Sequence, residues 1–153
     1  MRASGILLPV ASLPSRYGIG CFSKEAYEFV DFLKEAHQKY WQILPIGPTS
    51  YGDSPYQSFS TYAGNPYFIS LEDLIEQGLL TEKECDKVDF GSKTDKVDYE
   101  KLYNGRFELL KTAYEKSDIS EREEFKRFKA ENAYWLKDYA MFMAIKERFN
   151  GQS

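Results

Sequence analysis

Hydrophobic positions near the start of the chain follow two different periods. Residues 5–10 form a short apolar run without helical spacing, which predicts a strand buried on both faces. In residues 24–36, behind Ser23 as N-cap, apolar side chains recur at three- and four-residue steps, which predicts an amphipathic helix. Residues 40–45 are again short, aromatic and β-branched. Together these segments predict a strand, helix, strand unit with parallel strands.

The next segment, residues 46–68, has no periodicity and contains several Pro, Gly and hydroxyl residues. It is longer than the usual connection of about 4–6 residues, and loops of that length are commonly functional or disordered. Its Tyr and Phe residues favour an ordered, packed loop. It also follows the second strand on the carboxyl side, where barrel enzymes build their active sites. We therefore take residues 46–68 as the candidate substrate-binding loop.

Helical signals dominate the chain after residue 69. Ser70 is expected to cap a helix that stops at Gly78, and Thr81 with Glu84 has the spacing of a capping box. A further helix is expected near residues 99–115.

A second capping box is expected at Ser120 and Glu123, opening a long helix that stops at Asn150-Gly151. Large apolar residues in it recur at three- and four-residue steps, which we interpret as a helix-packing stripe: Trp135, Leu136, Tyr139, Phe142, Met143 and Phe149.

The predicted elements define an α/β fold class, but their sheet has too few strands to be complete. Two parallel strands do not make a stable sheet alone, and a (β/α)₈ barrel needs eight strands and about 250 residues. We expect residues 1–69 to form the first units of such a barrel and residues 70–153 to form an inserted, mainly helical subdomain, with the rest of the barrel absent. A complete small domain with a two-stranded element is the alternative.

Composition narrows the class of partner. The net charge of −4 disfavours nucleic acid and anionic membrane surfaces, and there is no apolar run of membrane-spanning length. Cys21 and Cys85 lie far apart without metal or redox spacing, so free thiols in a reducing compartment are expected. The start lacks a secretion signal, which adds to the expectation of a cytoplasmic protein.

Residues for catalysis or metal binding are scarce. The single histidine, His37, has no Cys or His at ligand spacing, so we expect a surface residue, no metal site and no cofactor. Gly18-Ile19-Gly20 lacks the third glycine of a phosphate loop and is explained by a turn. Asp53 is the only carboxylate in the candidate loop, and its place after Gly52 is typical of a turn former. Glycosyl transfer needs two carboxylates, so no catalytic residue is expected in this chain.

The loop contains a cluster suited to a sugar, Tyr51-Gly52-Asp53-Ser54-Pro55-Tyr56. The Ser54 hydroxyl could bond a sugar hydroxyl, and the Tyr56 ring could lie against a pyranose face while its phenol bonds another hydroxyl. Pro55 would stiffen the pair. A turn packed by its own tyrosines explains the same residues without a ligand.

Five short motifs resemble one family when they are taken in order. They are residues 5–15 (GILLPVASLPS), residues 18–20 (GIG), residues 41–45 (WQILP), residues 54–56 (SPY) and residues 65–66 (NP). Together they are similar to the start of the amylomaltases, the 4-α-glucanotransferases of glycoside hydrolase family 77. The likeness is close over residues 5–74 and looser over residues 135–149. Cys21 departs from it, because the family commonly has Asp there.

The resemblance implies a barrel enzyme that moves α-1,4-glucan segments between maltooligosaccharides or glucose by a retaining double displacement, without a cofactor. It implies that Tyr56 lies beside the sugar nearest the scissile bond, that Ser54 is a polar contact and that Tyr51 is an accessory glucan contact. The catalytic carboxylates would come from later strands, so this fragment alone would be inactive. A non-catalytic glucan-binding module is the second hypothesis, and a helical interaction domain after residue 68 is the third.

Overall fold

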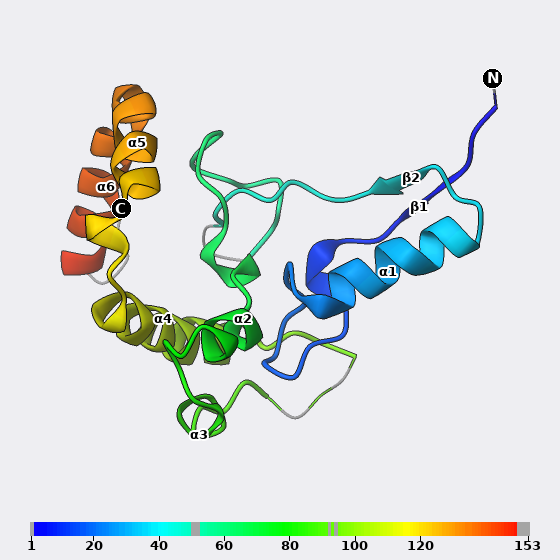
Figure 1. The fold of residues 1–153 in the computed structure, drawn as a ribbon, viewed down its shortest axis with the longest axis horizontal. Helices are drawn as coiled ribbons and strands as arrows, with labels where there is room; N and C mark the ends of the chain where they lie inside the picture. The colour runs from blue at the N-terminus through cyan, green and yellow to red at the C-terminus, as the bar shows by residue number, and fades with distance from the viewer. Residues whose placement is uncertain (1, 50–52, 92, 94, 150–153) are drawn as a thin grey trace. The chain divides into compact units, whose positions relative to one another are not determined.

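A computed structural model of the chain describes residues 2–49, 53–91, 93 and 95–149 (Figure 1). The chain divides into two compact units, residues 1–116 and residues 117–153.

The first unit opens with the predicted strand, helix, strand arrangement. Strand β1 (Gly5–Leu7) pairs in parallel with β2 (Tyr40–Gln42), and helix α1 (Lys24–Glu35) connects them. Ile6 lies opposite Trp41 in the register. Figure 1 shows α1 lying along the strand pair. The prediction of two parallel strands joined by a helix is therefore confirmed.

Both strands are shorter than predicted, and β1 is not buried on both faces. Pro9 has no N–H to donate to a ladder, and the chain turns directly afterwards into the 3₁₀ helix η1 (Val10–Ser12). Ile6 is 41% exposed and Leu7 is 55% exposed. Among the described residues each strand has one neighbour, which leaves side chains uncovered. The expectation of a fully buried strand was wrong for this structure.

Helix α1 begins after Ser23, as predicted, and its apolar face covers the strand ends. Ala26 packs with Val10 and Leu13 in a small core, and the Phe29 ring meets Trp41 with centroids 5.1 Å apart. Ser23 does not cap the helix through its hydroxyl, which donates to the Glu25 carboxylate instead.

The larger core of this unit is built by helices from the second half of its sequence. They are η2 (Pro66–Phe68), α2 (Leu71–Glu76), α3 (Glu82–Cys85) and α4 (Tyr99–Lys116). Their buried residues form one cluster with two residues from the segments between these helices and two from the loop after η1: Tyr17, Ile19, Tyr67, Leu71, Leu80, Cys85, Phe90, Leu102, Leu109 and Ala113. Both cysteines are buried free thiols, as expected.

The predicted helix boundaries of this region are confirmed by their hydrogen bonds. Ser70 Oγ accepts from Asp73 N at 3.0 Å, and Gly78 has the positive φ of +73° that a helix stop favours. Thr81 and Glu84 form both bonds of the capping box, at 3.2 Å and 2.8 Å.

The second unit contains η3 (Ile119–Glu121), α5 (Glu123–Glu131) and α6 (Ala133–Arg148). The capping box predicted at Ser120 was wrong: Ser120 lies inside η3, and Arg122 precedes α5 without a side-chain cap. The predicted long helix is two helices, interrupted at Asn132. Asn132 donates to the Phe128 carbonyl and accepts from Trp135 Nε1 at 2.9 Å, which closes the corner.

The predicted packing stripe lies on α6, where described apolar residues are half-buried or exposed rather than buried. The rings of Trp135 and Tyr139 contact each other with centroids 5.9 Å apart. Over the described part of the chain, every helix is too short or too polar to cross a membrane.

Candidate functional site

The candidate loop leaves and re-enters the fold at one point. The Ile46 carbonyl accepts from Asn65 N at 2.8 Å, and the Asn65 side chain accepts from Tyr67 N at 3.0 Å. Asn65 thereby caps η2 while Pro66 occupies its first position, where a missing N–H costs nothing. The Asn65-Pro66 motif thus holds the two ends of the loop together.

Ser54 and Tyr56 lie in one β-turn at the outer part of this loop. Gln57 N donates to the Ser54 carbonyl at 3.0 Å, which places Pro55 and Tyr56 at the two central positions. Proline at the first central position has the backbone angle that the turn requires. Tyr56 N also approaches Ser54 Oγ at 3.4 Å. The Tyr56 side chain is 73% exposed and Ser54 is half-buried, so the turn presents an aromatic ring beside a hydroxyl. The third predicted residue, Tyr51, lies outside the described residues.

A cavity of about 200 Å³ lies beneath this turn, at the carboxyl ends of both strands. Residues that follow β1 and β2 line it, together with Pro55 from the turn and Tyr99 from the start of α4. Its polar side chains are Ser12, Thr49, Asp53, Asn65, Tyr67 and Tyr99. The loop therefore lies on the side of the strands where the sequence placed it.

The charge in this cavity comes from Asp53. Burial raises the pKa of its carboxyl, and a hydrogen bond from Thr49 Oγ1 at 3.3 Å opposes that rise. Burial, with the nearby Asp53 charge, raises the pKa of the Tyr67 and Tyr99 phenols. The described lining holds no Lys, Arg or His. Hydroxyls, an amide and one carboxylate suit a neutral ligand rich in hydroxyl groups, whereas a lone carboxylate cannot supply the acid and base of glycosyl transfer.

Asp53 lies immediately before the Ser54–Gln57 turn rather than within it. Its φ is 54°, in the left-handed region that Asp tolerates better than most residues. The Gly18-Ile19-Gly20 segment is a turn, as expected. Gly18 has φ +84°, and a Cβ on Gly20 would come within 2.2 Å of the Val10 carbonyl oxygen. Gly20 thus allows close packing against the end of η1, and Gly18 allows close packing against Phe90.

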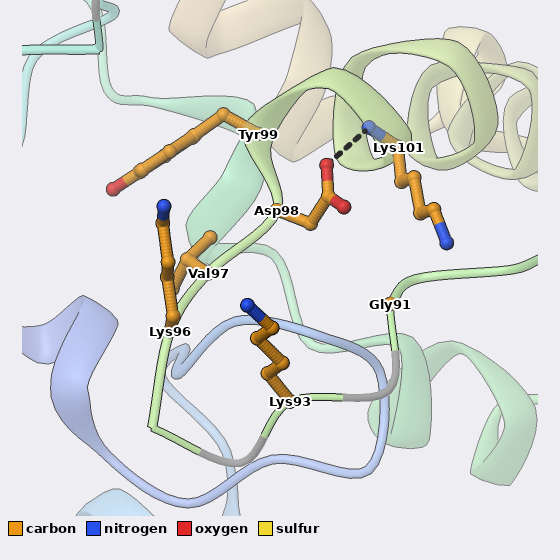
Figure 2. A pocket seen from close by; sticks show the side chains of 7 residues that line it. All are labelled: Gly91, Lys93, Lys96, Val97, Asp98, Tyr99 and Lys101. Atoms are coloured by element: carbon orange, nitrogen blue, oxygen red, sulfur yellow. Dashed lines mark hydrogen bonds between the residues drawn. The ribbon is translucent and has the colours of Figure 1, made fainter.

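A second hollow, of about 390 Å³, lies between Gly91 and the first turn of α4 (Figure 2). Lys93, Lys96 and Lys101 border it, yet Asp98 already accepts from Lys101 N at 3.2 Å and caps the helix. An anion there would meet the Asp98 carboxylate, so the described lining of this hollow does not favour an anion. His37 is exposed, and no cluster of metal-ligating side chains occurs in the described ranges.

Sequence reasoning missed the inner wall of the cavity. Tyr67 and Tyr99 come from η2 and α4, and their rings lie 6.1 Å apart. Tyr67 could have been suspected from the Asn65-Pro66 motif beside it. Tyr99 carries no local signal, because its place depends on how α4 packs.

The chain is similar to known proteins over most of its length. Residues 8–153 match the family described as 4-alpha-glucanotransferase. A 4-alpha-glucanotransferase of Streptococcus pneumoniae is 51% identical over 150 residues, which cover 97% of this chain and 30% of that protein. A chloroplastic/amyloplastic 4-alpha-glucanotransferase of Solanum tuberosum is 33% identical over 158 residues, covering 97% of this chain and 27% of that protein.

A solved structure is similar over the whole chain. It is an amylomaltase from Streptococcus agalactiae in complex with acarbose, with a TM-score of 0.90 and 42% identity, and the match covers 100% of this chain and 31% of that one. The chain belongs to the 4-alpha-glucanotransferase family. It spans about 30% of the length of the curated relatives it matches.

Proposed function

We propose that this chain is the N-terminal part of a 4-α-glucanotransferase and supplies one wall of its glucan-binding cleft. The whole enzyme would transfer α-1,4-glucan segments between maltooligosaccharides or glucose by a retaining double displacement. Family membership and the 97% coverage of this chain by a 4-alpha-glucanotransferase support the proposal.

The observation that carries the assignment of the cleft is the Ser54–Gln57 turn above the cavity at the strand ends. A pyranose has an apolar C–H face rimmed by hydroxyls, so the exposed Tyr56 ring can cover the face while Ser54 bonds the rim. The amylomaltase of similar structure was solved with acarbose, which supports a saccharide ligand at the same fold. We assign Tyr51 an accessory glucan contact on the resemblance alone.

The reacting carboxylates belong, in this proposal, to parts of the enzyme that the chain does not span. A retaining mechanism needs two carboxyl groups about 5–5.5 Å apart, and the described cavity lining offers Asp53 alone. This chain by itself is therefore proposed to be inactive. The complete enzyme would need no cofactor, because its nucleophile and its acid/base would both be side chains.

The architecture follows the same reasoning. Residues 1–69 would be the first units of a (β/α)₈ barrel, and residues 70–153 would be a helical insertion. The exposed Ile6 and Leu7 of β1 fit a strand that further barrel strands and helices cover. We propose a cytoplasmic location, since α-1,4-glucans of the cell interior would be the substrates.

The test compares the protein encoded by the complete reading frame with residues 1–153 alone, using glucose release from maltotriose. The complete protein should disproportionate maltotriose, and the isolated chain should not. Tyr56→Ala in the complete protein should raise KM about tenfold, the equivalent of about 1.4 kcal/mol of lost contact. Tyr27→Ala is the matched control, because Tyr27 on α1 is also 73% exposed. An inactive complete protein, or a KM unchanged by Tyr56→Ala, would refute the proposal.

A non-catalytic glucan-binding module uses the same turn and is the second candidate. It predicts that residues 1–153 fold cooperatively and bind maltooligosaccharide by calorimetry, with the complete protein binding glucan without releasing glucose. The exposed apolar side chains of β1 favour the barrel enzyme, because a self-contained module would cover them.

A further inference from the structure

Asp53 combines a left-handed backbone with an inward carboxylate, immediately before the turn that carries Ser54 and Tyr56. Its φ of 54° is a conformation that most side chains avoid. A residue held there redirects the chain, so the conformation of Asp53 sets the direction in which the next four residues leave. Tyr56 is held to this direction by the bond from Gln57 N to the Ser54 carbonyl.

The Asp53 carboxylate is held by a hydrogen bond from another residue of the same loop. Its Oδ1 accepts from Thr49 Oγ1 at 3.3 Å, across four residues of the loop. Asp53 is half-buried and lines the 200 Å³ cavity, whereas Tyr56 is largely exposed and is not part of the lining. The Asp53 charge contributes to the raised pKa of the Tyr67 and Tyr99 phenols, which line the same cavity from η2 and α4.

The inner wall that faces Asp53 belongs to the larger core. Tyr67 is 5% exposed and packs its ring against Phe107 of α4 at 5.5 Å. The cavity wall opposite Asp53 is therefore fixed by packing, while Asp53 itself is held by Thr49 of the same loop. A half-buried, hydrogen-bonded carboxylate on a left-handed residue can set the direction of the turn that follows.

We propose that Asp53 is a positioning residue, whose carboxylate bond to Thr49 fixes the left-handed backbone that aims Tyr56 at the glucan. This inference rests on the proposed function, because it takes Tyr56 as the sugar contact. Asp53 touches no reacting atom in this role. This role requires the Asp53 carboxylate. If Asp53 only formed a turn, any residue that tolerates a positive φ would serve in its place.

Three substitutions at one position separate the backbone from the carboxylate. Asp53→Gly keeps the left-handed conformation accessible and removes the side chain. Asp53→Asn keeps both the conformation and a neutral acceptor for Thr49. Asp53→Ala removes the acceptor and disfavours the conformation. Thr49→Val removes the hydroxyl that donates to Asp53, whereas Thr49→Ser keeps a hydroxyl at this position. Asp31→Asn, on the exposed face of α1, controls for the loss of a negative charge.

The readout is the split between KM and kcat for maltotriose in the complete protein. Asp53→Gly, Asp53→Ala and Thr49→Val should each raise KM about tenfold with kcat within about twofold, since an aimed contact is lost and the reacting groups are untouched. Asp53→Asn and Thr49→Ser should stay within about threefold of wild-type KM. A wild-type KM in either Asp53→Gly or Thr49→Val overturns the inference, since the backbone alone would then suffice.

A second readout does not depend on sugar binding, and so separates failure of this inference from failure of the proposed function. Chymotrypsin cleavage after Tyr56, followed by mass spectrometry, reports how firmly the turn is held. Asp53→Gly should speed this cleavage about fivefold and leave cleavage after Tyr62 unchanged. Equal rates for Asp53→Gly and wild type overturn the anchoring. A faster cleavage in a protein without transferase activity retains the anchoring and refutes only the proposed function.

Discussion

Arg106 donates from Nη2 to the carbonyl oxygen of Ile69 at 2.6 Å, deep in the first unit. Its Nη1 donates to the Tyr17 carbonyl at 3.2 Å, and the residue is 1% exposed. Burial lowers the pKa of this guanidinium, an effect that the neighbouring Cys21 opposes. One side chain of α4 thus joins the loop after η1 to the residue that leaves η2. Both segments border the cavity.

Arg106→Met should destabilise the first unit by about 3 kcal/mol. The methionine fills similar space but removes two hydrogen bonds of a charged group, one to the buried Tyr17 carbonyl and one to the part-buried Ile69 carbonyl, each contributing about 1.5–3 kcal/mol. Urea unfolding followed by circular dichroism measures the change. Lys111→Met, at an exposed position of the same helix, should change the free energy of unfolding by less than about 0.5 kcal/mol. Equal effects of the two substitutions would show that the Arg106 bonds are not structural.

The thiols of Cys21 and Cys85 should be unreactive in the folded protein. Both are at most 1% exposed, and burial raises the pKa of each, so little thiolate forms at pH 8. Ellman's reagent should therefore modify neither until urea is added, after which both should react. Ala3→Cys, at an exposed position, should react at once and serves as the positive control. Rapid labelling of native Cys21 would contradict the packing around Arg106.

Stability should fall at alkaline pH. Burial raises the pKa of the Tyr67 phenol above the ordinary value of about 10, so the phenol loses its proton at a lower pH in the unfolded chain than in the folded one. The stabilising effect is complete below about pH 9 and declines as the pH rises past 10, by up to about 1.4 kcal/mol per unit for this group. Tyr67→Phe should flatten the decline between pH 10 and 11 in urea titrations. Tyr27→Phe controls for loss of a hydroxyl, and an identical decline in both variants would rule out Tyr67 as the cause.

The Thr81 cap should matter more than its exposure suggests. Helix α3 has four residues, and the capping box satisfies its first amide groups. Thr81→Ala should cost about 1 kcal/mol in the free energy of unfolding, whereas Thr81→Ser should cost only a few tenths, because it keeps the accepting oxygen. The two thermal melts give the comparison directly. Equal losses would mean that the methyl group of Thr81, rather than its hydroxyl, is what stabilises the helix.

What the sequence predicted well was local. The Thr81 box and the α1 periodicity each depend on residues within a few positions, and both appear as expected. Ser120 has the same spacing as Thr81, but Ser120 lies inside the 3₁₀ helix η3, whereas Thr81 has the extended backbone of an N-cap. Spacing alone did not distinguish these two outcomes.

The remaining features depend on tertiary packing, which no local pattern encodes. Arg106 sits in a helix that looks polar, so its burial could not be read from its neighbours. The pairing of Asp53 with Thr49 lay within one loop, yet the wall behind it, Tyr67 and Tyr99, was assembled only when α4 packed against η2. Ser54 and Tyr56 could be predicted as sugar contacts because they form a contiguous motif.

The bond from Asn65 N to the Ile46 carbonyl has a consequence for how this region can change. The two ends of this loop are held together by a backbone hydrogen bond. The entropic cost of closing a longer loop between the same two ends rises by only about 0.6 kcal/mol for each doubling of its length. Related sequences can therefore differ in length and composition between Ile46 and Asn65 without a change in the packing of the two cores beneath the loop.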